Sequence, residues 1–157
     1  MILKLFYTFF LGLLVALFVG LGIDAFYEGP QAPDYPSELN LQKTDCGEYA
    51  DLKAEQEKFD QDMKSFNEKS KAYNRNVSIA SLVFAILIMI VSLTFFAKIK
   101  MIADGILLGG VFTTAYSIIR GLMSENSKFR FIIVTIGLII ALILGYIKFI
   151  RPKENKE

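Results

Sequence analysis

Four long stretches of this chain carry few or no charged side chains, and this pattern restricts the fold more than any other feature. The first runs from Leu5 to Ile23, and these 19 residues, as a helix, reach about 30 Å, the thickness of the hydrocarbon core of a bilayer. Three more follow within residues 77–97, 101–123 and 128–150. With 54% hydrophobic residues in a chain of 157, the composition is too apolar for a water-soluble domain. The sequence predicts an all-α integral membrane protein with four transmembrane helices.

The predicted segments follow from these stretches and from the composition between them. A signal peptide is the rival interpretation of the first stretch, but the apolar run is long and the residues near Ala25 make a poor cleavage site, so we favour an uncleaved anchor. The expected transmembrane helices are residues 2–23, 77–97, 101–123 and 128–150, separated by a Pro-containing loop at 24–44 and an amphipathic helix at 45–76, and followed by a basic tail at 151–157.

The distribution of basic residues near the span ends predicts the orientation. Seven lie on the side that holds both termini: Lys4, Lys98, Lys100, Lys148, Arg151, Lys153 and Lys156. Three lie on the other side, at Arg120, Lys128 and Arg130, and three more if Lys69, Lys71 and Arg75 are counted. Because basic loops stay in the cytoplasm, we expect a multi-pass protein of the cell membrane with both termini and the basic tail cytoplasmic. Residues 24–76 are then extracytoplasmic.

The segment before the second span is expected to be one helix that continues into the membrane. Asp45 and Glu48 have the spacing of a capping box, which marks a helix start. After Gly47 no glycine occurs until Gly105, and residues 48–76 are rich in helix-forming Glu, Lys, Ala and Gln. The sequence therefore predicts a long extracytoplasmic helix continuous with the second span.

A period of 3.5 residues runs along this helix. The apolar positions of the seam are Tyr49, Leu52, Phe59, Met63, Phe66 and Tyr73, interrupted by Gln56 and Ser70. Such a seam is typical of helix association, as in a coiled coil, although aromatic and polar seam positions are unfavourable for a tight dimer. The alternatives are packing on the chain's own residues 24–44 and adsorption to the bilayer, which normally requires a more basic polar face.

Small residues recur every four positions in three of the spans. They are Gly12, Ala16 and Gly20 in the first, Gly105, Gly109 and Gly121 in the third, and Gly137, Ala141 and Gly145 in the fourth. Lipid provides no hydrophobic drive for helices to associate, so small residues that let backbones approach are a common packing device. We expect these positions to pack helices within one four-helix bundle, with a subunit interface as the alternative.

Polar side chains at membrane depth are few. Thr113, Thr114 and Ser117 form a row in the third span and are the candidates for a pore-facing surface. The alternative is that these hydroxyl groups return their hydrogen bonds to the preceding helical turn. Since Asp104 and Arg120 can sit at headgroup level, no charge is expected at mid-span, and an ion-coupled transporter is disfavoured.

The residue inventory argues against enzymatic chemistry. The chain has no His and a single Cys, so we predict no catalytic residues, no cofactor site and no metal site. Cys46 is interpreted as a free thiol, with a disulfide between two chains as the alternative. Lys148 and the basic tail are interpreted as an anchor on anionic lipid, so no nucleic-acid partner is expected.

Several groups of residues carry a resemblance to other proteins. In the last third they are the run from Gly105 through Tyr116 to Arg120, Lys128-Phe-Arg-Phe-Ile-Ile and Gly145-Tyr-Ile-Lys, and before it they are the motif Tyr73-Asn-Arg-Asn and Cys46 near the start of the outer helix. In these residues the chain resembles small four-span membrane proteins of bacteria with reduced genomes, whose activity is uncharacterised. In topology alone it is similar to connexin-like large-pore channels, although it lacks the paired cysteines of their outer loops.

These features lead to two hypotheses about function. The first is a non-enzymatic, self-assembling membrane protein, a homo-oligomer built through the outer helix and the small-residue faces, with a pore as one form of the assembly. The second is an accessory subunit whose outer helix docks on another envelope protein. In both cases the expected partners are the lipid bilayer and a protein, either another copy of this chain or a foreign one.

Overall fold

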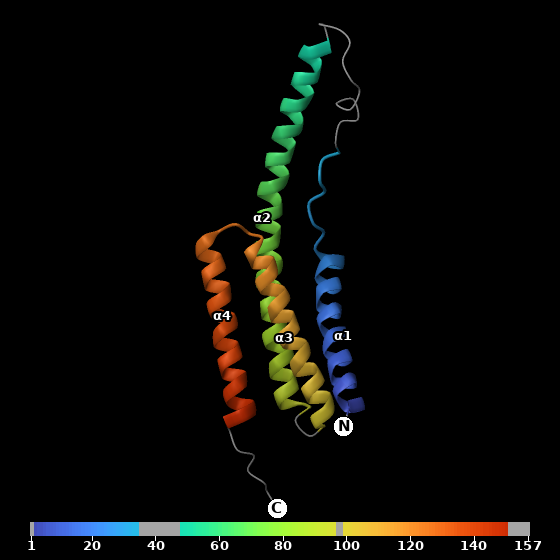
Figure 1. The fold of residues 1–157 in the computed structure, drawn as a ribbon, viewed down its shortest axis with the longest axis vertical. Helices are drawn as coiled ribbons and strands as arrows, with labels where there is room; N and C mark the ends of the chain where they lie inside the picture. The colour runs from blue at the N-terminus through green and yellow to red at the C-terminus, as the bar shows by residue number, and fades with distance from the viewer. Residues whose placement is uncertain (1, 35–47, 97–98, 151–157) are drawn as a thin grey trace, which may run out of the picture.

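The computed structural model describes residues 2–34, 48–96 and 99–150, and these form only helices and short connections (Figure 1). The helices are α1 (Ile2–Phe26), α2 (Glu48–Thr94), α3 (Lys100–Leu122), α4 (Ser127–Gly145) and the π-helical turn η2 (Tyr146–Ile150). Within the described residues, four helices are long and apolar enough to cross a membrane. The predicted all-helical fold with four candidate spans is confirmed, and it suggests a multi-pass membrane protein.

α2 is much longer than a membrane span. Its 47 residues would reach about 70 Å at roughly 1.5 Å per residue, and in Figure 1 it projects well beyond the other helices. We call residues 48–76 the stalk, and the end of the bundle from which it projects the stalk end. No glycine or proline interrupts this helix, which is why it can continue unbroken. The predicted location of the stalk outside a membrane stays a prediction.

The helix boundaries differ from the predicted ones by a few residues. α1 continues to Phe26 rather than ending at residue 23, and α2 ends at Thr94, short of the predicted residue 97. α4 starts at Ser127 because the side chain of Asn126 caps it, accepting a hydrogen bond from the Phe129 backbone N–H at 3.1 Å. Asp45 of the expected capping box and Cys46 lie outside the described residues, as do parts of the 24–44 loop and the tail at 151–157.

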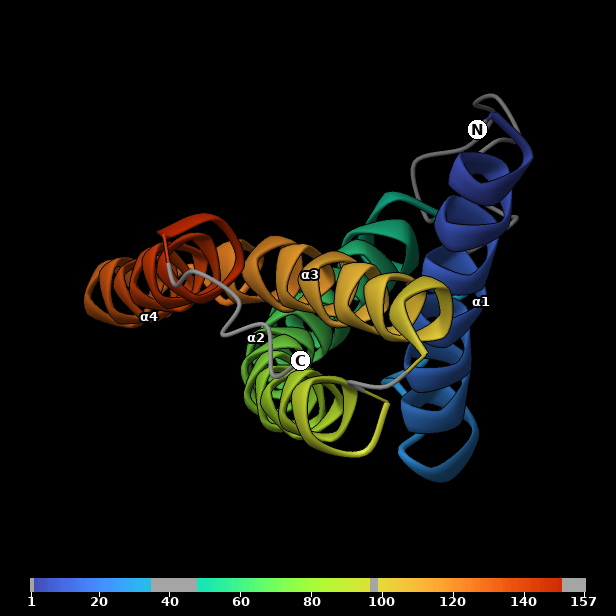
Figure 2. The same ribbon diagram turned by 90° about the horizontal axis from the view of Figure 1, so that it is seen from below.

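α3 is the central helix of the bundle. Its contacts with α2 and α1 are the most extensive between elements, whereas α1 and α2 touch each other much less. Seen from below, α3 lies between α4 and α1, with α2 against its side (Figure 2). α1 begins and α4 ends at the same end of the bundle (Figure 1). The bundle is therefore organised around α3 rather than around a shared four-helix core.

The contact between α2 and α3 is lined with serine. Ser78 donates from its hydroxyl to the Ser117 carbonyl at 2.7 Å, and the Ser117 hydroxyl donates to the Ser78 carbonyl at 2.7 Å. Near the other end of the same contact, the Ser92 hydroxyl donates to the Ala103 carbonyl at 2.6 Å. Small polar side chains let the two backbones approach and supply hydrogen bonds between helices, so they hold α2 and α3 as an antiparallel pair.

Candidate functional site

The small residues of α1 and α3 meet where these two helices cross. A Cβ atom built on Gly109 would lie 2.6 Å from Val15 Cβ and 3.1 Å from the Gly12 carbonyl oxygen. A Cβ atom on Gly105 would lie 2.7 Å from Leu11 Cδ2, and one on Gly12 would lie 3.1 Å from Leu108 Cβ. Only glycine lets the helices approach this closely. These three predicted packing positions are therefore used inside the chain.

The remaining small residues divide between helix contacts and open grooves. Gly121 approaches Ser78 and Ile133, and Gly137 approaches Ile118, so both lie at contacts of α3 with its neighbours. In contrast, Cβ atoms built on Gly20 and Gly145 would meet nothing within 4 Å. Ala16 and Gly20 line a groove beside α1, and Ala141 and Gly145 line one beside α4. Within the described residues, Gly20 and Gly145 therefore lie at no close helix contact, and the expectation that Ala16 and Ala141 pack helices stays a prediction.

The polar row of α3 is buried inside the bundle. Thr113 and Ser117 are 0% exposed and Thr114 is 7% exposed. The threonine hydroxyls donate to the Gly109 and Gly110 carbonyls at 2.8 and 2.9 Å, one turn earlier on the same helix, and Ser117 bonds to α2. The hydrogen bonds of these side chains are satisfied within the chain. The row faces neighbouring helices instead of an open surface of the chain.

The predicted seam of α2 changes character along its length. At its base Tyr73 is 8% exposed and packs against α1 and the segment that follows it. Farther out on the stalk, the side chains of Phe59, Met63 and Phe66 are half-buried. The side chains of Tyr49 and Leu52 lie outside the described part of the structure. Packing on the chain's own residues, one of the three alternatives, therefore applies to the base of the seam.

A polar and aromatic cluster joins α1 and α2 at the stalk end. The rings of Tyr27 and Tyr73 stack with their centres 5.2 Å apart and an interplanar angle of 9°. The Tyr73 hydroxyl donates to Asp24 Oδ1 at 3.5 Å, and the Asn76 side-chain amide donates to the Tyr27 hydroxyl at 3.0 Å. These contacts tie the end of α1 to the base of the stalk.

Arg120 of α3 connects this cluster to the rest of the bundle. Its Nε donates to the Tyr116 hydroxyl at 3.0 Å, and its Nη1 donates to Asn74 Oδ1 at 3.0 Å. The guanidinium carbon lies 5.8 Å from the centre of the Tyr73 ring and 5.4 Å from that of Tyr116, within the range of cation–π attraction. One cation thus links three aromatic or amide side chains from α2 and α3.

Sequence reasoning placed Arg120 at headgroup level but did not identify this cluster. Asn74 and Asn76 entered only through the resemblance, in the motif Tyr73-Asn-Arg-Asn. The motif lies just before the second apolar stretch, and Arg120 lies near the end of the third. These two positions together were the sequence signal that could have located the cluster. Antiparallel neighbours bring such positions to the same bundle end.

Two apolar grooves flank α1 below the cluster. One, of about 330 Å³, lies between α1 and α3 and is bounded by Leu13, Leu17, Asp24 and Arg120 among others. The second, of about 550 Å³, lies between α1 and α2 and includes Phe18, Gly22 and Phe84. Both grooves end at the polar side chains of the stalk end, so each combines an apolar wall with polar groups at one end.

The loop between α3 and α4 is tied to the stalk by an ion pair. Lys71 Nζ lies 2.5 Å from Glu125 Oε2. Glu125 adopts a left-handed backbone conformation with φ of 56°, which costs a non-glycine residue energy. The hydrogen bond and charge of Lys71 hold the pKa of the Glu125 carboxyl below its usual range.

This ion pair predicts a pH dependence. Because the pKa of Glu125 is lowered in the folded state, its contribution to stability is present above the unfolded pKa of about 4.3 and is lost as pH falls through the lower folded pKa. We expect wild-type protein to lose more thermal stability than Glu125→Gln on acidification from about pH 6 to about pH 3. Lys71→Gln should remove the same pH step. Equal losses in all three proteins would contradict the prediction.

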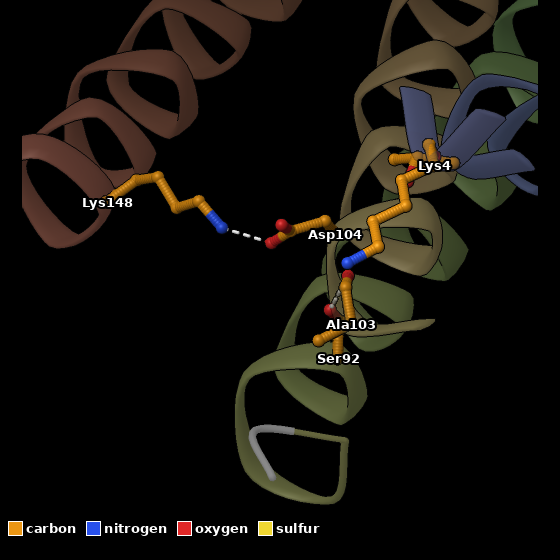
Figure 3. Close-up of polar contacts among 6 residues, drawn as sticks. Lys4, Ser92, Ala103, Asp104 and Lys148 are labelled. Atoms are coloured by element: carbon orange, nitrogen blue, oxygen red, sulfur yellow. Dashed lines mark hydrogen bonds and ion pairs between the residues drawn. The ribbon is translucent and has the colours of Figure 1, made fainter. Parts of the chain in front are cut away.

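The opposite end of the bundle carries the second ion pair, between Lys148 of η2 and Asp104 of α3. In Figure 3 the Lys148 side chain extends to Asp104, while Lys4 of α1 points toward the same end of α3. A groove of about 320 Å³ separates α3 from α4 here and is bounded by both charged residues. The ion pair therefore bridges two helices that otherwise diverge.

In the part of the chain that the structure describes, these features define a helical framework with a polar cluster at the stalk end. Among the described residues, no group of three or more His, Cys, Asp or Glu side chains could hold a metal ion. The polar cluster at the stalk end and the grooves below it are the candidate site. Comparisons with known protein families, with curated proteins and with solved structures find no match for this chain.

Proposed function

We propose that this protein is a non-enzymatic membrane scaffold that self-associates through the stalk. The observation that carries the proposal is the 47-residue α2 helix, whose outer part extends past the other helices with an apolar seam along it (Figure 1). A helix that combines a 3.5-residue apolar period with charged flanks is suited to pack against a second helix of the same kind. The cell membrane is the proposed location, with the stalk outside and both termini in the cytoplasm.

Most small residues of the bundle make contacts within the chain, which favours the stalk as the association surface. Gly12, Gly105 and Gly109 are occupied by the α1–α3 crossing, and Gly121 and Gly137 by other contacts of α3. Most of the small-residue stripes are therefore already used within one chain, and they support a homo-oligomer less than the sequence suggested. Because Thr113, Thr114 and Ser117 are also buried, support for a pore lined by α3 is correspondingly weak.

The stalk remains as a surface of the right chemistry. Met63 and Phe66 lie one turn apart and keep part of their apolar surface exposed, while Gln61 and Ser65 on the other side of the helix are exposed and polar. Burying a fully exposed side chain of this size stabilises by about 1.5–3 kcal/mol. Because Met63 and Phe66 are already half-buried, each contributes only part of that on association, and the two together favour pairing of chains confined to a membrane.

We expect wild-type protein in lipid vesicles to give discrete oligomers when its stalk lysines are cross-linked. The double variant Met63→Glu with Phe66→Glu should weaken association at least about tenfold, because each change puts a charge into the seam. The double variant Gln61→Glu with Ser65→Glu adds the same charge on the side of the helix away from the seam and should associate as wild type does. Mass measurement in mild detergent provides the size of the assembly.

Two results would count against self-association. One is a wild-type protein that stays monomeric in both vesicles and mild detergent. The other is loss of association in both double variants alike, which would indicate a general effect of charge. Co-purification of a foreign membrane protein at fixed stoichiometry, lost only in the seam variant, would support the docking hypothesis in its place.

A further inference from the structure

The groove between α1 and α3 has an unusual rim. Its walls are apolar, with Leu13, Leu17 and Leu21 from α1, while its stalk end carries one acidic and one basic side chain, Asp24 and Arg120. Its volume of about 330 Å³ lies at the lower end of the range for small-molecule sites, about 300–1,000 Å³. An occupant must therefore be apolar along most of its length and dipolar at one end.

The two charges on the rim are held in place without neutralising each other. Among the described residues the ion pairs are Lys71–Glu125 and Lys148–Asp104, so Asp24 and Arg120 do not pair. Tyr73 stands between them, because its hydroxyl bonds to Asp24 and its ring lies beside the Arg120 guanidinium. The rim has no net charge and a separated cation and anion.

Arg120 keeps donor capacity for a ligand. Its Nε and one Nη1 hydrogen bond hold the guanidinium against Tyr116 and Asn74, so of the five N–H donors of arginine about three remain. A positioned guanidinium is well suited to bind phosphate oxygens through paired hydrogen bonds. On the other side of the rim, the Asp24 carboxylate, positioned by the Tyr73 hydroxyl, is a charge partner for an ammonium group.

We propose that this groove binds one zwitterionic phospholipid with a primary ammonium headgroup, phosphatidylethanolamine. Its phosphate lies at Arg120, its ammonium at Asp24, and an acyl chain lies along the leucines of α1. An anionic lipid matches the rim less well, because it supplies no cation for Asp24. An apolar helix would cover both charges without pairing them, which is costly in a membrane. The inference rests on the membrane location of the bundle and is independent of self-association by the stalk.

Gly20 keeps the groove open. It lines the groove, and a Cβ atom at this position meets nothing within 4 Å, so a larger side chain there fills the groove without displacing a helix. Gly22, two residues later, is equally open but lines the other groove, between α1 and α2. Gly20→Leu and Gly22→Leu therefore make a matched pair: the same change on the same helix, in different grooves.

The test is native mass spectrometry of protein extracted from vesicles of equal phosphatidylethanolamine and phosphatidylglycerol. We expect wild-type protein to retain one phosphatidylethanolamine in preference to phosphatidylglycerol by roughly fivefold. Gly20→Leu should lower this retention about tenfold, whereas Gly22→Leu should not. Asp24→Asn leaves a net positive rim, so its preference should shift to phosphatidylglycerol, whereas Glu28→Gln, which removes the same charge outside the groove, should keep the wild-type preference.

Several results would overturn the proposal. Retention that is the same in Gly20→Leu and Gly22→Leu would mean that the lipid is not in this groove. A wild-type preference for phosphatidylglycerol, or a preference unchanged in Asp24→Asn, would mean that the rim does not recognise a zwitterion. A lipid-free dimer that Gly20→Leu abolishes would assign the groove to a second copy of the chain. Gly20→Leu and Gly22→Leu leave every side chain of the cluster unchanged, so this arm of the test does not depend on a change that disturbs the cluster.

Discussion

Gly109→Ala is expected to destabilise the bundle by about 2 kcal/mol, even though it adds a single methyl group. The new Cβ atom would lie 2.6 Å from Val15 Cβ and Cγ1 and 3.1 Å from the Gly12 carbonyl oxygen. Val15 Cβ is bonded directly to the α1 backbone, so no rotation of its side chain relieves the clash. α1 must move away from α3, and the whole crossing loses contact. Overpacking costs about 1–3 kcal/mol, and the helix propensity of alanine offsets up to about 1 kcal/mol.

Two other glycines are controls for this effect. At Gly110 the nearest atom to a built Cβ is Met89 Cγ at 2.5 Å. Methionine is flexible and can rearrange, so Gly110→Ala should cost less, about 1 kcal/mol or below. Gly20→Ala meets nothing within 4 Å and should be neutral or stabilising by up to about 1 kcal/mol. The predicted order of stability is Gly20→Ala, then Gly110→Ala, then Gly109→Ala.

Unfolding by SDS in mixed micelles can measure this order, with energy transfer between probes at the ends of α1 and α3 as the signal. The probes report separation of the two helices. Helix content alone would not report this separation, because α1 and α3 stay helical in micelles. If Gly109→Ala were as stable as Gly20→Ala, close approach of α1 and α3 at Gly109 would have to be abandoned as the basis of the crossing.

Arg120→Leu is the second large effect that we expect, a loss of about 2–3 kcal/mol. The substitution removes the hydrogen bonds to Tyr116 and Asn74 and the cation beside two tyrosine rings. Asn74 is 7% exposed, so its side-chain carbonyl is left without this donor in a place that water reaches poorly. An unsatisfied buried polar group costs about 1–3 kcal/mol, and the lost cation–π contacts add about 0.5–1 kcal/mol.

Arg75→Leu is the matched control, because Arg75 lies next to Asn74 in sequence but is exposed. Such a surface change is expected to stay within about 0.5 kcal/mol of wild type. Arg120→Lys should recover only part of the loss, since an ammonium cannot reproduce both directions of the guanidinium fork. Measurement in detergent without added phospholipid separates this effect from any contribution of bound lipid. Equal stability of Arg120→Leu and Arg75→Leu would rule out a structural role for the cluster.

The helical content of this protein follows from the sequence because each helix is determined locally. The apolar runs have the length of a bilayer span, and the lack of glycine and proline in residues 48–76 allows α2 to continue without a break. The helix ends differ from the predicted span bounds by a few residues, and at the start of α4 the cause is local, the Asn126 cap. Such details shift a helix end by a few residues without changing the helix.

Pairing between helices is what only the tertiary structure decided. The stripes containing Gly20 and Gly109 look alike in sequence, yet Gly109 lies in a tight crossing and Gly20 lines an open groove. In lipid, an apolar face that contacts another helix and one that contacts acyl chains have the same composition, so periodicity does not identify the partner. The same holds for Arg120 and Asn74, which are 46 positions apart. Their contact depends on how far α2 and α3 are shifted along each other, and that shift is set by side-chain packing at Ser78 and Ser117.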